Sequence, residues 1–120
     1  ICTGRECEAV RRRAADLKIT DVYQNVRRKA DFLADFFAKE GYRREEAAYC
    51  GDDVNDLAAM DLCGFVGCPA DASDLILARA DYICPQRGGE GAVRGLVQKI
   101  LQDDGRWKDA VQAAFGVRLD

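Results

Sequence analysis

The sequence has 120 residues, of which 48% are apolar and 32% are charged. This balance is typical of one folded domain rather than of a disordered chain. The net charge of −3 and the pI near 5.0 give no general attraction to nucleic acids or anionic membranes. No apolar run approaches the roughly 20 residues of a membrane-spanning helix, and the absence of histidine excludes catalytic systems that depend on it.

The predicted elements alternate between short extended segments and helices, the βαβα pattern of a parallel sheet covered by helices. The predicted strands are residues 1–3 (the end of a strand), 21–24, 47–50, 65–68 and 82–84. The predicted helices are residues 6–17, 29–40, about 55–62, 74–78 and 92–102. Gly41 ends the second helix, and Ser73 is the expected N-cap of the fourth. We expect residues 1–102 to form one domain and residues 103–120 a partly helical tail.

Six cysteines are spread along the chain, and no two of them form a Cys-x-x-Cys pair. Most stand in apolar surroundings, such as Ala-Ala-Tyr-Cys at residues 47–50, where cysteine behaves as a small buried hydrophobe. We therefore expect reduced thiols rather than disulfides or a zinc cluster, which predicts a cytoplasmic location.

An acidic segment, Gly51-Asp52-Asp53-Val54-Asn55-Asp56, directly follows the apolar strand 47–50. Three carboxylates within five residues repel one another unless a cation lies among them. Open α/β sheets bind their ligands at the carboxyl ends of strands, and hard oxygen ligands suit Mg²⁺. The alternative is an acidic loop in which Asp53 or Asn55 caps the next helix. Three carboxylates favour the metal, so Asp52, Asp53 and Asp56 are predicted to form a Mg²⁺ site.

Two further segments are candidates for phosphate binding. Thr3-Gly4-Arg5 offers a hydroxyl and backbone N–H groups at the turn between a strand and a helix. Lys29 opens the helix that follows the second strand, where a compact positive charge can reach a phosphate. Each signal is weak alone, because Thr-Gly is also common where a chain enters a helix, and a single lysine is commonly a solvated surface residue.

Together, in this order, these segments resemble the haloacid dehalogenase (HAD) phosphatase superfamily: Thr3 matches its second motif, Lys29 its third, and residues 51–56 its fourth. The resemblance is closest to the 3-deoxy-D-manno-octulosonate 8-phosphate (KDO-8-phosphate) phosphatase family. The supporting strings are Cys2-Thr3-Gly4-Arg5, Glu8-Ala9-Val10-Arg11-Arg12-Arg13-Ala14, Val22-Tyr23-Gln24, Pro69-Ala70-Asp71-Ala72 and Gly88-Gly89-Glu90-Gly91-Ala92-Val93-Arg94. The resemblance implies an α/β, Rossmann-like (HAD-like) three-layer fold with a parallel sheet. Only one helix and one short strand separate Thr3 from Lys29, so no cap domain is expected between them.

The resemblance also implies a Mg²⁺-dependent phosphatase that acts on a 3-deoxy sugar-acid phosphate such as KDO-8-phosphate. In this family an aspartate attacks phosphorus to form an aspartyl-phosphate, and a second aspartate serves as general acid and base. Thr3 would then bind the phosphoryl oxygens, Lys29 would stabilise the aspartate and phosphoryl charge, and Asp52 would hold the metal. Asp53 and Asp56 would support the waters of the metal and Lys29.

A homotetramer is a further implication, in which neighbouring subunits replace the missing cap. Gly4 and Arg5 would face the substrate, and Arg13 would pair with the carboxylate of a sugar acid in a neighbouring site. Alternatively, Arg5 is a salt-bridged surface arginine, and Arg13 belongs to a solvated basic face with its two preceding arginines. Neither nucleic acid nor membrane is an expected partner.

The first motif of the family, Asp-x-Asp-Gly-x-x-x-Thr/Ser, supplies both catalytic aspartates, and this chain contains no Asp-x-Asp pair. We therefore expect the nucleophile upstream of Ile1 and the chain alone to be inactive. The alternative is a non-catalytic oligomerisation module, like those that follow the cytidylyltransferase domain of some CMP-sialic acid synthetases. The set of Thr3, Lys29, Asp52 and Asp56 favours the enzyme, because assembly does not need it. The order of these residues also disfavours a phosphoacceptor receiver domain.

Overall fold

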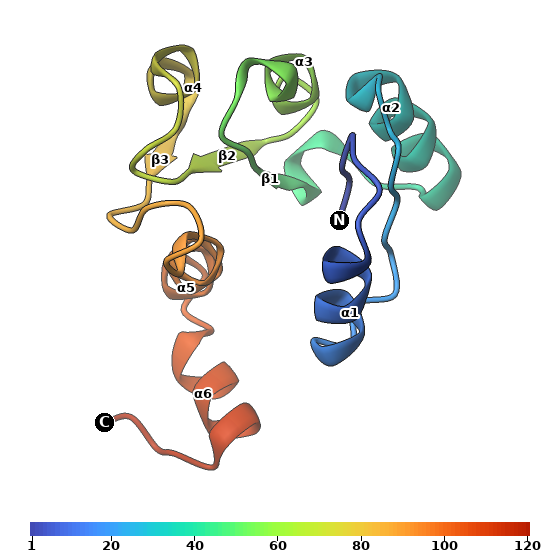
Figure 1. Cartoon of the computed structure of the whole chain (residues 1–120). Coiled ribbons are helices and arrows are strands. Elements are labelled where there is room, and N and C mark those ends of the chain that lie inside the picture. Colours follow the sequence, from blue (N-terminus) through green and yellow to red (C-terminus); the bar gives the residue numbers. More distant parts are fainter. The chain divides into compact units, whose positions relative to one another are not determined.

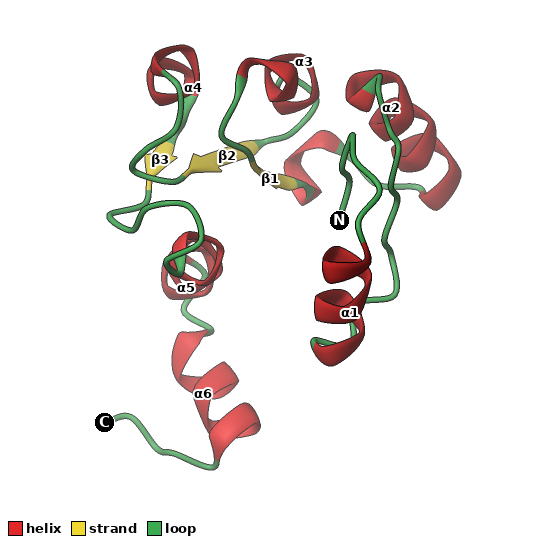
Figure 2. Ribbon diagram, viewed as in Figure 1, coloured by secondary structure: helices red, strands yellow, loops and turns green.

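The computed structural model describes all 120 residues and divides into two compact units. The first unit comprises residues 1–47 and 55–64, and the second comprises residues 48–54 and 65–120. The three strands all belong to the second unit, whereas the first consists of helices and loops (Figure 2). None of the helices is long and apolar enough to cross a membrane.

The second unit is built on a parallel sheet in the order β1-β2-β3. These strands are β1 (Ala48–Cys50), β2 (Phe65–Cys68) and β3 (Tyr82–Ile83). The helices α4 (Asp74–Arg79) and α5 (Ala92–Asp103) lie on opposite sides of the sheet (Figure 1). The prediction of a parallel sheet covered by helices is thereby confirmed.

The side chains of β2 point alternately to the two faces of the sheet, as in any strand. Both faces therefore carry residues that need to be covered by a helix. Gly67 faces α5 closely: a Cβ atom there would lie 2.6 Å from Cδ1 of Leu96. Val66 and Cys68 point the other way and are fully buried, as is Ile76 of α4. The central strand therefore contributes to a core on each side.

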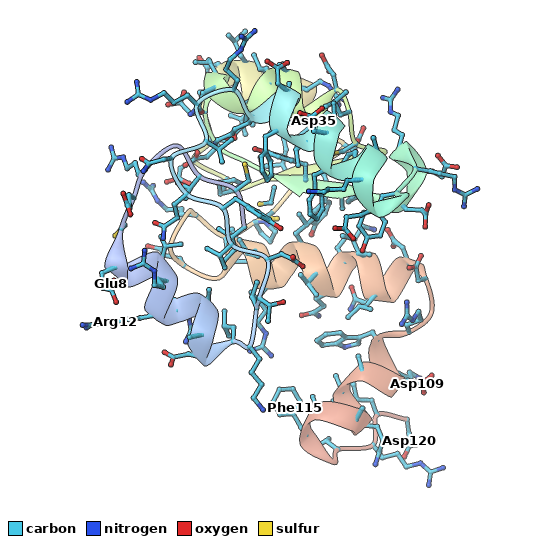
Figure 3. The ribbon with its side chains drawn as sticks, turned by 90° about the vertical axis from the view of Figure 1, so that its right-hand side faces the viewer. Glu8, Arg12, Asp35, Asp109, Phe115 and Asp120 are labelled. Carbon is cyan, nitrogen blue, oxygen red and sulfur yellow. The ribbon has the colours of Figure 1, made fainter.

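A last helix, α6 (Trp107–Phe115), follows α5 and packs against it. None of its residues is buried, and Phe115 is 67% exposed (Figure 3). The expected tail from residue 103 is thus largely helical. The proposed boundary between a domain of residues 1–102 and this tail stays a prediction.

The first unit contains α1 (Glu8–Asp16), α2 (Lys29–Glu40) and α3 (Leu57–Met60), with short 3₁₀ turns at Arg44–Glu46 and Val54–Asp56. Helices α2 and α3 pack against each other. On α2, Phe32 and Phe36 contact the ring of Tyr23, with centroid distances of 4.8 and 5.7 Å. Gly41 ends α2 in the left-handed conformation, with φ of 74°, as the sequence predicts.

Some local predictions were wrong. The expected strands at 1–3 and 21–24 shrink to one parallel bridge, between Cys2 and Tyr23. They extend no further because the Thr3 carbonyl accepts the N–H of Val26, while the N–H of Asn25, which would continue the parallel ladder, donates to the Arg5 carbonyl. Ser73 does precede α4, but its hydroxyl makes no capping hydrogen bond. Its carbonyl instead accepts the N–H of Ile76.

Burial also departs from the sequence pattern in two places. On α1 only Ala14 is buried, and the apolar Leu17, which the sequence predicts to be part of the helix, is 52% exposed. Leu17 lies at the C-cap, where the helix has already ended. None of the six cysteines forms a disulfide; three of them are buried and Cys7 is exposed.

Candidate active site

Thr3 is fixed by backbone hydrogen bonds on both sides. Its N–H donates to the carbonyl of Tyr23 at 3.0 Å, and its carbonyl accepts the N–H of Val26 at 2.9 Å. Its Oγ1 accepts the N–H of Arg5 at 3.3 Å. Gly4 lies in this turn, where a Cβ atom would make only an ordinary contact, 3.5 Å from the Val26 carbonyl. The turn therefore places the Thr3 hydroxyl at a defined position, followed by the exposed Arg5.

A second loop, residues 24–28, is bonded to this turn and leads into α2. Asn25 adopts the left-handed conformation, with φ of 57°. Its backbone N–H donates to the Arg5 carbonyl, and its side-chain amide donates to Glu6 at 2.9 Å. The Gln24 side chain accepts the N–H of Cys7 at 2.6 Å. Together with the bond from the Val26 N–H to the Thr3 carbonyl, four contacts connect residues 3–7 to the loop that leads to Lys29.

Lys29 and Asp56 form a buried ion pair within the first unit. The Lys29 Nζ and the Asp56 Oδ1 are 2.8 Å apart, and the side chains are only 11% and 6% exposed. Lys29 is the first residue of α2, and Asp56 precedes α3, so the packing of these helices brings the two charges together. Asp56 is the one buried charged residue of the chain. Removing two charges from water costs several kcal/mol per ion, so each charge depends on the other.

Cys2 is a neighbour of this pair that the sequence did not identify. Burial raises the pKa of the Cys2 thiol, and the positive charge of Lys29 partly opposes this effect. The thiol is therefore neutral near pH 7. The sequence around Cys2 gives no indication that this residue lies near Lys29 and Asp56, because the packing of three distant segments brings the three residues near one another.

Asp52 and Asp53 lie in the second unit, at the carboxyl end of β1, and both are exposed. The Asp52 carbonyl accepts the N–H of Ser73 at 2.9 Å. The Asp53 Oδ1 accepts the N–H of Val54 at 2.7 Å. The alternative is that Asp53 or Asn55 caps the next helix, but this contact reaches only the adjacent residue, and the residue that precedes α3 is Asp56. The metal-ligand role of these residues stays a prediction.

The donor set is compatible with a hard cation, because two exposed carboxylates follow a parallel strand, where such sheets bind ligands. No group of three or more Cys, Asp or Glu side chains in the chain is arranged to hold a metal ion. Asp56 pairs with Lys29, and Asp52 and Asp53 belong to the other unit. The three carboxylates are therefore not grouped as a complete metal site, and their role in metal binding stays a prediction.

The arginines of α1 form an exposed face with its acidic residues. Arg11 pairs with Glu8 at 2.6 Å, and Arg12 lies 3.7 Å from the same residue. Glu8 and Arg12 project outward from the helix (Figure 3). Arg13 is also exposed. Arg11 and Arg12 thus lie on a solvent-exposed face of the helix, as the alternative interpretation expects. The role of Arg13 in substrate binding stays a prediction.

A second contact that the sequence did not predict joins two loops of the second unit. Asp71 Oδ1 accepts the N–H of Gly88 at 2.7 Å, and Asp71 Oδ2 lies 3.8 Å from the Arg87 guanidinium. The Gly88 N–H lowers the pKa of Asp71, with a smaller contribution from Arg87. Both residues stand in strings typical of the family, but neither string reveals that they meet.

Comparison with solved structures identifies the fold. A KDO-8-phosphate phosphatase from Moraxella catarrhalis, solved in complex with a magnesium ion, a phosphate ion and KDO, superposes with a TM-score of 0.87. It is 36% identical and matches 96% of this chain and 66% of its own. The chain has a HAD-like fold. This confirms the predicted α/β class with a parallel sheet, and no cap domain is present in the chain.

Other proteins of HAD-like fold agree. The cobalt-bound form of the Haemophilus influenzae phosphatase gives a TM-score of 0.81 at 34% identity, over 88% of this chain and 61% of its own. A chain of Legionella pneumophila assigned to HAD subfamily III A gives 0.90 at 28% identity, over 98% of this chain and 64% of its own.

Sequence comparison gives the same group of enzymes. The KDO-8-phosphate phosphatase of Escherichia coli K12 is 37% identical over 110 residues, which are 92% of this chain and 58% of the relative. That of Haemophilus influenzae is 34% identical over 106 residues, 88% of this chain and 59% of the relative. The chain thus spans about three fifths of the length of these relatives. No family model matches the sequence.

Proposed function

We propose that the chain forms the larger part of a Mg²⁺-dependent HAD-superfamily phosphatase that hydrolyses a 3-deoxy sugar-acid phosphate such as KDO-8-phosphate. The observation that carries this proposal is the buried pair of Lys29 and Asp56. Two desolvated charges stabilise a fold poorly in comparison with apolar side chains of the same size. Their presence is understandable if Lys29 must stay charged and fixed beside a phosphoryl group.

Each residue of the first unit then has a distinct part. Thr3 Oγ1 already accepts the N–H of Arg5, so its own proton is the group that donates to a phosphoryl oxygen. Lys29 supplies positive charge for the phosphoryl oxygens and the attacking aspartate, and Asp56 holds the ammonium group in place. Gly4 and Arg5 face the substrate, where Arg5 suits an acidic sugar.

Asp52, in the second unit, is the proposed magnesium ligand, and Asp53 and Asp56 are proposed to support the waters of the ion and Lys29. When bound, magnesium neutralises phosphate charge as the phosphoryl group is transferred. The exposed position of Asp52 and Asp53 after β1 supports this assignment. The magnesium in the Moraxella catarrhalis structure is consistent with it.

The nucleophile is proposed to lie upstream of Ile1, in a longer protein. The lack of an Asp-x-Asp pair and the span of 58% of the E. coli relative support this. The upstream aspartate would attack phosphorus, and the ester P–O bond would break as a second aspartate protonates the leaving alkoxide. Water would then hydrolyse the aspartyl-phosphate, regenerating the carboxylate and releasing phosphate. The chain alone is expected to be inactive.

The longer protein is proposed to be a homotetramer in which Arg13 reaches the sugar-acid carboxylate in a neighbouring site. Sedimentation tests the assembly, since a monomer at working concentration would refute a cap borrowed from a neighbour. The exposed position of Arg13 on α1 leaves its side chain available for such a contact.

The proposed function is tested by phosphate release from KDO-8-phosphate by the longer protein with Mg²⁺. Asp52→Asn is expected to abolish turnover with little change in thermal unfolding, because Asp52 is exposed and its backbone contact persists. Asp109→Asn, on the exposed start of α6, is the matched control and is expected to retain activity (Figure 3). Turnover retained by Asp52→Asn would remove Asp52 from the metal site.

A further inference from the structure

Two loops at the carboxyl end of the sheet are connected to each other within the second unit. Residues 69–73 follow β2, and residues 84–91 follow β3. The N–H of Ala70 donates to the carbonyl of Gln86 at 2.8 Å. The N–H of Gly88 donates to Asp71 Oδ1 at 2.7 Å, and Arg87 lies 3.8 Å from Asp71 Oδ2. One backbone contact and one carboxylate therefore join the loops.

The glycine-rich segment 86–91 has little else to fix its conformation. Gly89 and Gly91 have φ of 78° and 95°, in the region that favours glycine. A Cβ atom at either position would meet nothing within 4 Å, so these two glycines do not pack against other atoms. A turn bond from the Glu90 N–H to the Arg87 carbonyl, 3.0 Å long, is local. Asp71 is therefore the side chain that ties the segment to a neighbouring loop.

The loop that carries Asp71 is also bonded to the acidic segment after β1. The N–H of Ser73 donates to the carbonyl of Asp52 at 2.9 Å. A continuous series of hydrogen bonds thus runs from Asp52, through residues 69–73, to Gly88. All of these groups follow the carboxyl ends of parallel strands, where open α/β sheets bind their ligands.

We infer that Asp71 is a positioning residue, which holds segment 86–91 in place at the ligand-binding end of the sheet and thereby sets the affinity for substrate. The claim about substrate affinity rests on the proposed function, whereas the claim that Asp71 holds the segment in place does not. The lowered pKa of Asp71 supports the first part, because an ionised acceptor makes the bond to the Gly88 N–H charge-assisted and stronger. Asp71 touches no reacting atom in this account and acts through the segment that it orders.

Three variants test the inference. Asp71→Ala removes the acceptor, Asp71→Asn keeps an acceptor oxygen without the charge, and Asp74→Ala removes a nearby exposed carboxylate for which no ion pair is observed. Hydrogen exchange of the Gly88 amide is measured by NMR on this chain. The Val66 amide, which is bonded to Asp81 in the same unit, reports whether the fold is retained.

Exchange at Gly88 is expected to accelerate on the order of tenfold in Asp71→Ala, less in Asp71→Asn and not in Asp74→Ala. Unchanged exchange at Gly88 in Asp71→Ala, with Val66 still protected, would overturn the inference. If the Val66 amide loses protection in Asp71→Ala, that variant has lost its fold. The inference is then tested by comparing exchange at Gly88 in Asp71→Asn and in Asp74→Ala. Exchange at Gly88 that is equal in these two variants would then overturn it.

The effect on substrate is measured in the longer protein. Asp71→Ala is expected to raise KM for the sugar-acid phosphate several-fold while kcat stays within about twofold, and Asp71→Asn is expected to restore part of the affinity. An unchanged KM alongside faster Gly88 exchange would overturn the link to substrate. If the unmodified longer protein releases no phosphate, the proposed function fails, whereas the exchange experiment still decides whether Asp71 orders the segment.

Discussion

The buried pair of Lys29 and Asp56 gives the sharpest prediction for stability. Asp56→Asn keeps the shape of the side chain and removes its charge, which leaves the Lys29 ammonium buried beside a neutral amide. The exposed pair of Lys99 and Asp103 is a matched control. Its Nζ–Oδ1 distance is 2.9 Å, almost equal to the 2.8 Å of the buried pair, but its side chains are 38% and 52% exposed.

The expected magnitudes differ because the surroundings differ. Leaving one charge of a buried pair without its partner costs about 3–5 kcal/mol. An exposed pair four residues apart on a helix contributes only about 0.3–0.5 kcal/mol, because water screens both charges. With a urea m-value of about 2 kcal/mol per molar, the unfolding midpoint should fall by about 1.5–2.5 M in Asp56→Asn and by about 0.2 M in Asp103→Asn.

Urea unfolding followed by circular dichroism measures both variants. The double variant Lys29→Met/Asp56→Leu separates lost charge from lost packing, because apolar side chains of similar size in place of a buried pair are often neutral or stabilising. We expect it to recover most of the stability lost in Asp56→Asn. Equal midpoints for Asp56→Asn and Asp103→Asn would refute the reasoning from burial, and so would a double variant less stable than Asp56→Asn.

Three further predictions concern a thiol, a loop and a strand. Burial raises the pKa of Cys2 above 9.0 and Lys29 opposes this, so the rate of Cys2 alkylation, followed by peptide mass spectrometry, should still be rising with pH at pH 9, and its midpoint should move further up in Lys29→Met; a midpoint below 9.0, or a downward shift in the variant, would contradict this. The Gly88 N–H lowers the pKa of Asp71 below 3.8. The hydrogen bond between Gly88 and Asp71 should therefore persist down to pH 3.8 and be lost only as the pH falls through the lowered pKa. A titration of the Gly88 amide with a midpoint at or above pH 3.8 would count against this. Gly67→Ala would place a Cβ atom 2.6 Å from buried Leu96, so it should destabilise by about 1–3 kcal/mol in urea, and unchanged stability would argue against this packing.

Much of the secondary structure followed from local pattern. The bounds of α2 and β2 are those predicted, because the aromatic residues of α2 repeat at helical spacing before Gly41, and β2 is an apolar run closed by Pro69. The predicted pairing of 1–3 with 21–24 is limited to one bridge because the Thr3 carbonyl accepts the N–H of Val26 instead of that of Asn25. Whether two short segments pair over one residue or three depends on contacts outside both.

The candidate site also contains some contacts that the sequence indicated and others that it did not. The resemblance, based on three short motifs, associated Asp56 with Lys29, and the 2.8 Å contact between them is present in the structure. The electrostatic effect of Lys29 on Cys2 and the contact of Asp71 with Gly88 were not predicted, because each involves residues at least 17 positions apart that tertiary packing brings near each other. Periodicity and spacing along one sequence do not encode such contacts.

Phosphate release from KDO-8-phosphate tests the central claim most directly, measured with Mg²⁺ for this chain and for the same chain joined to its upstream coding sequence. The account predicts Mg²⁺-dependent release by the longer protein and none by the 120-residue chain. Release by the chain alone would contradict the proposed upstream nucleophile. No release by the longer protein from any sugar-acid phosphate tested would contradict the proposed function itself.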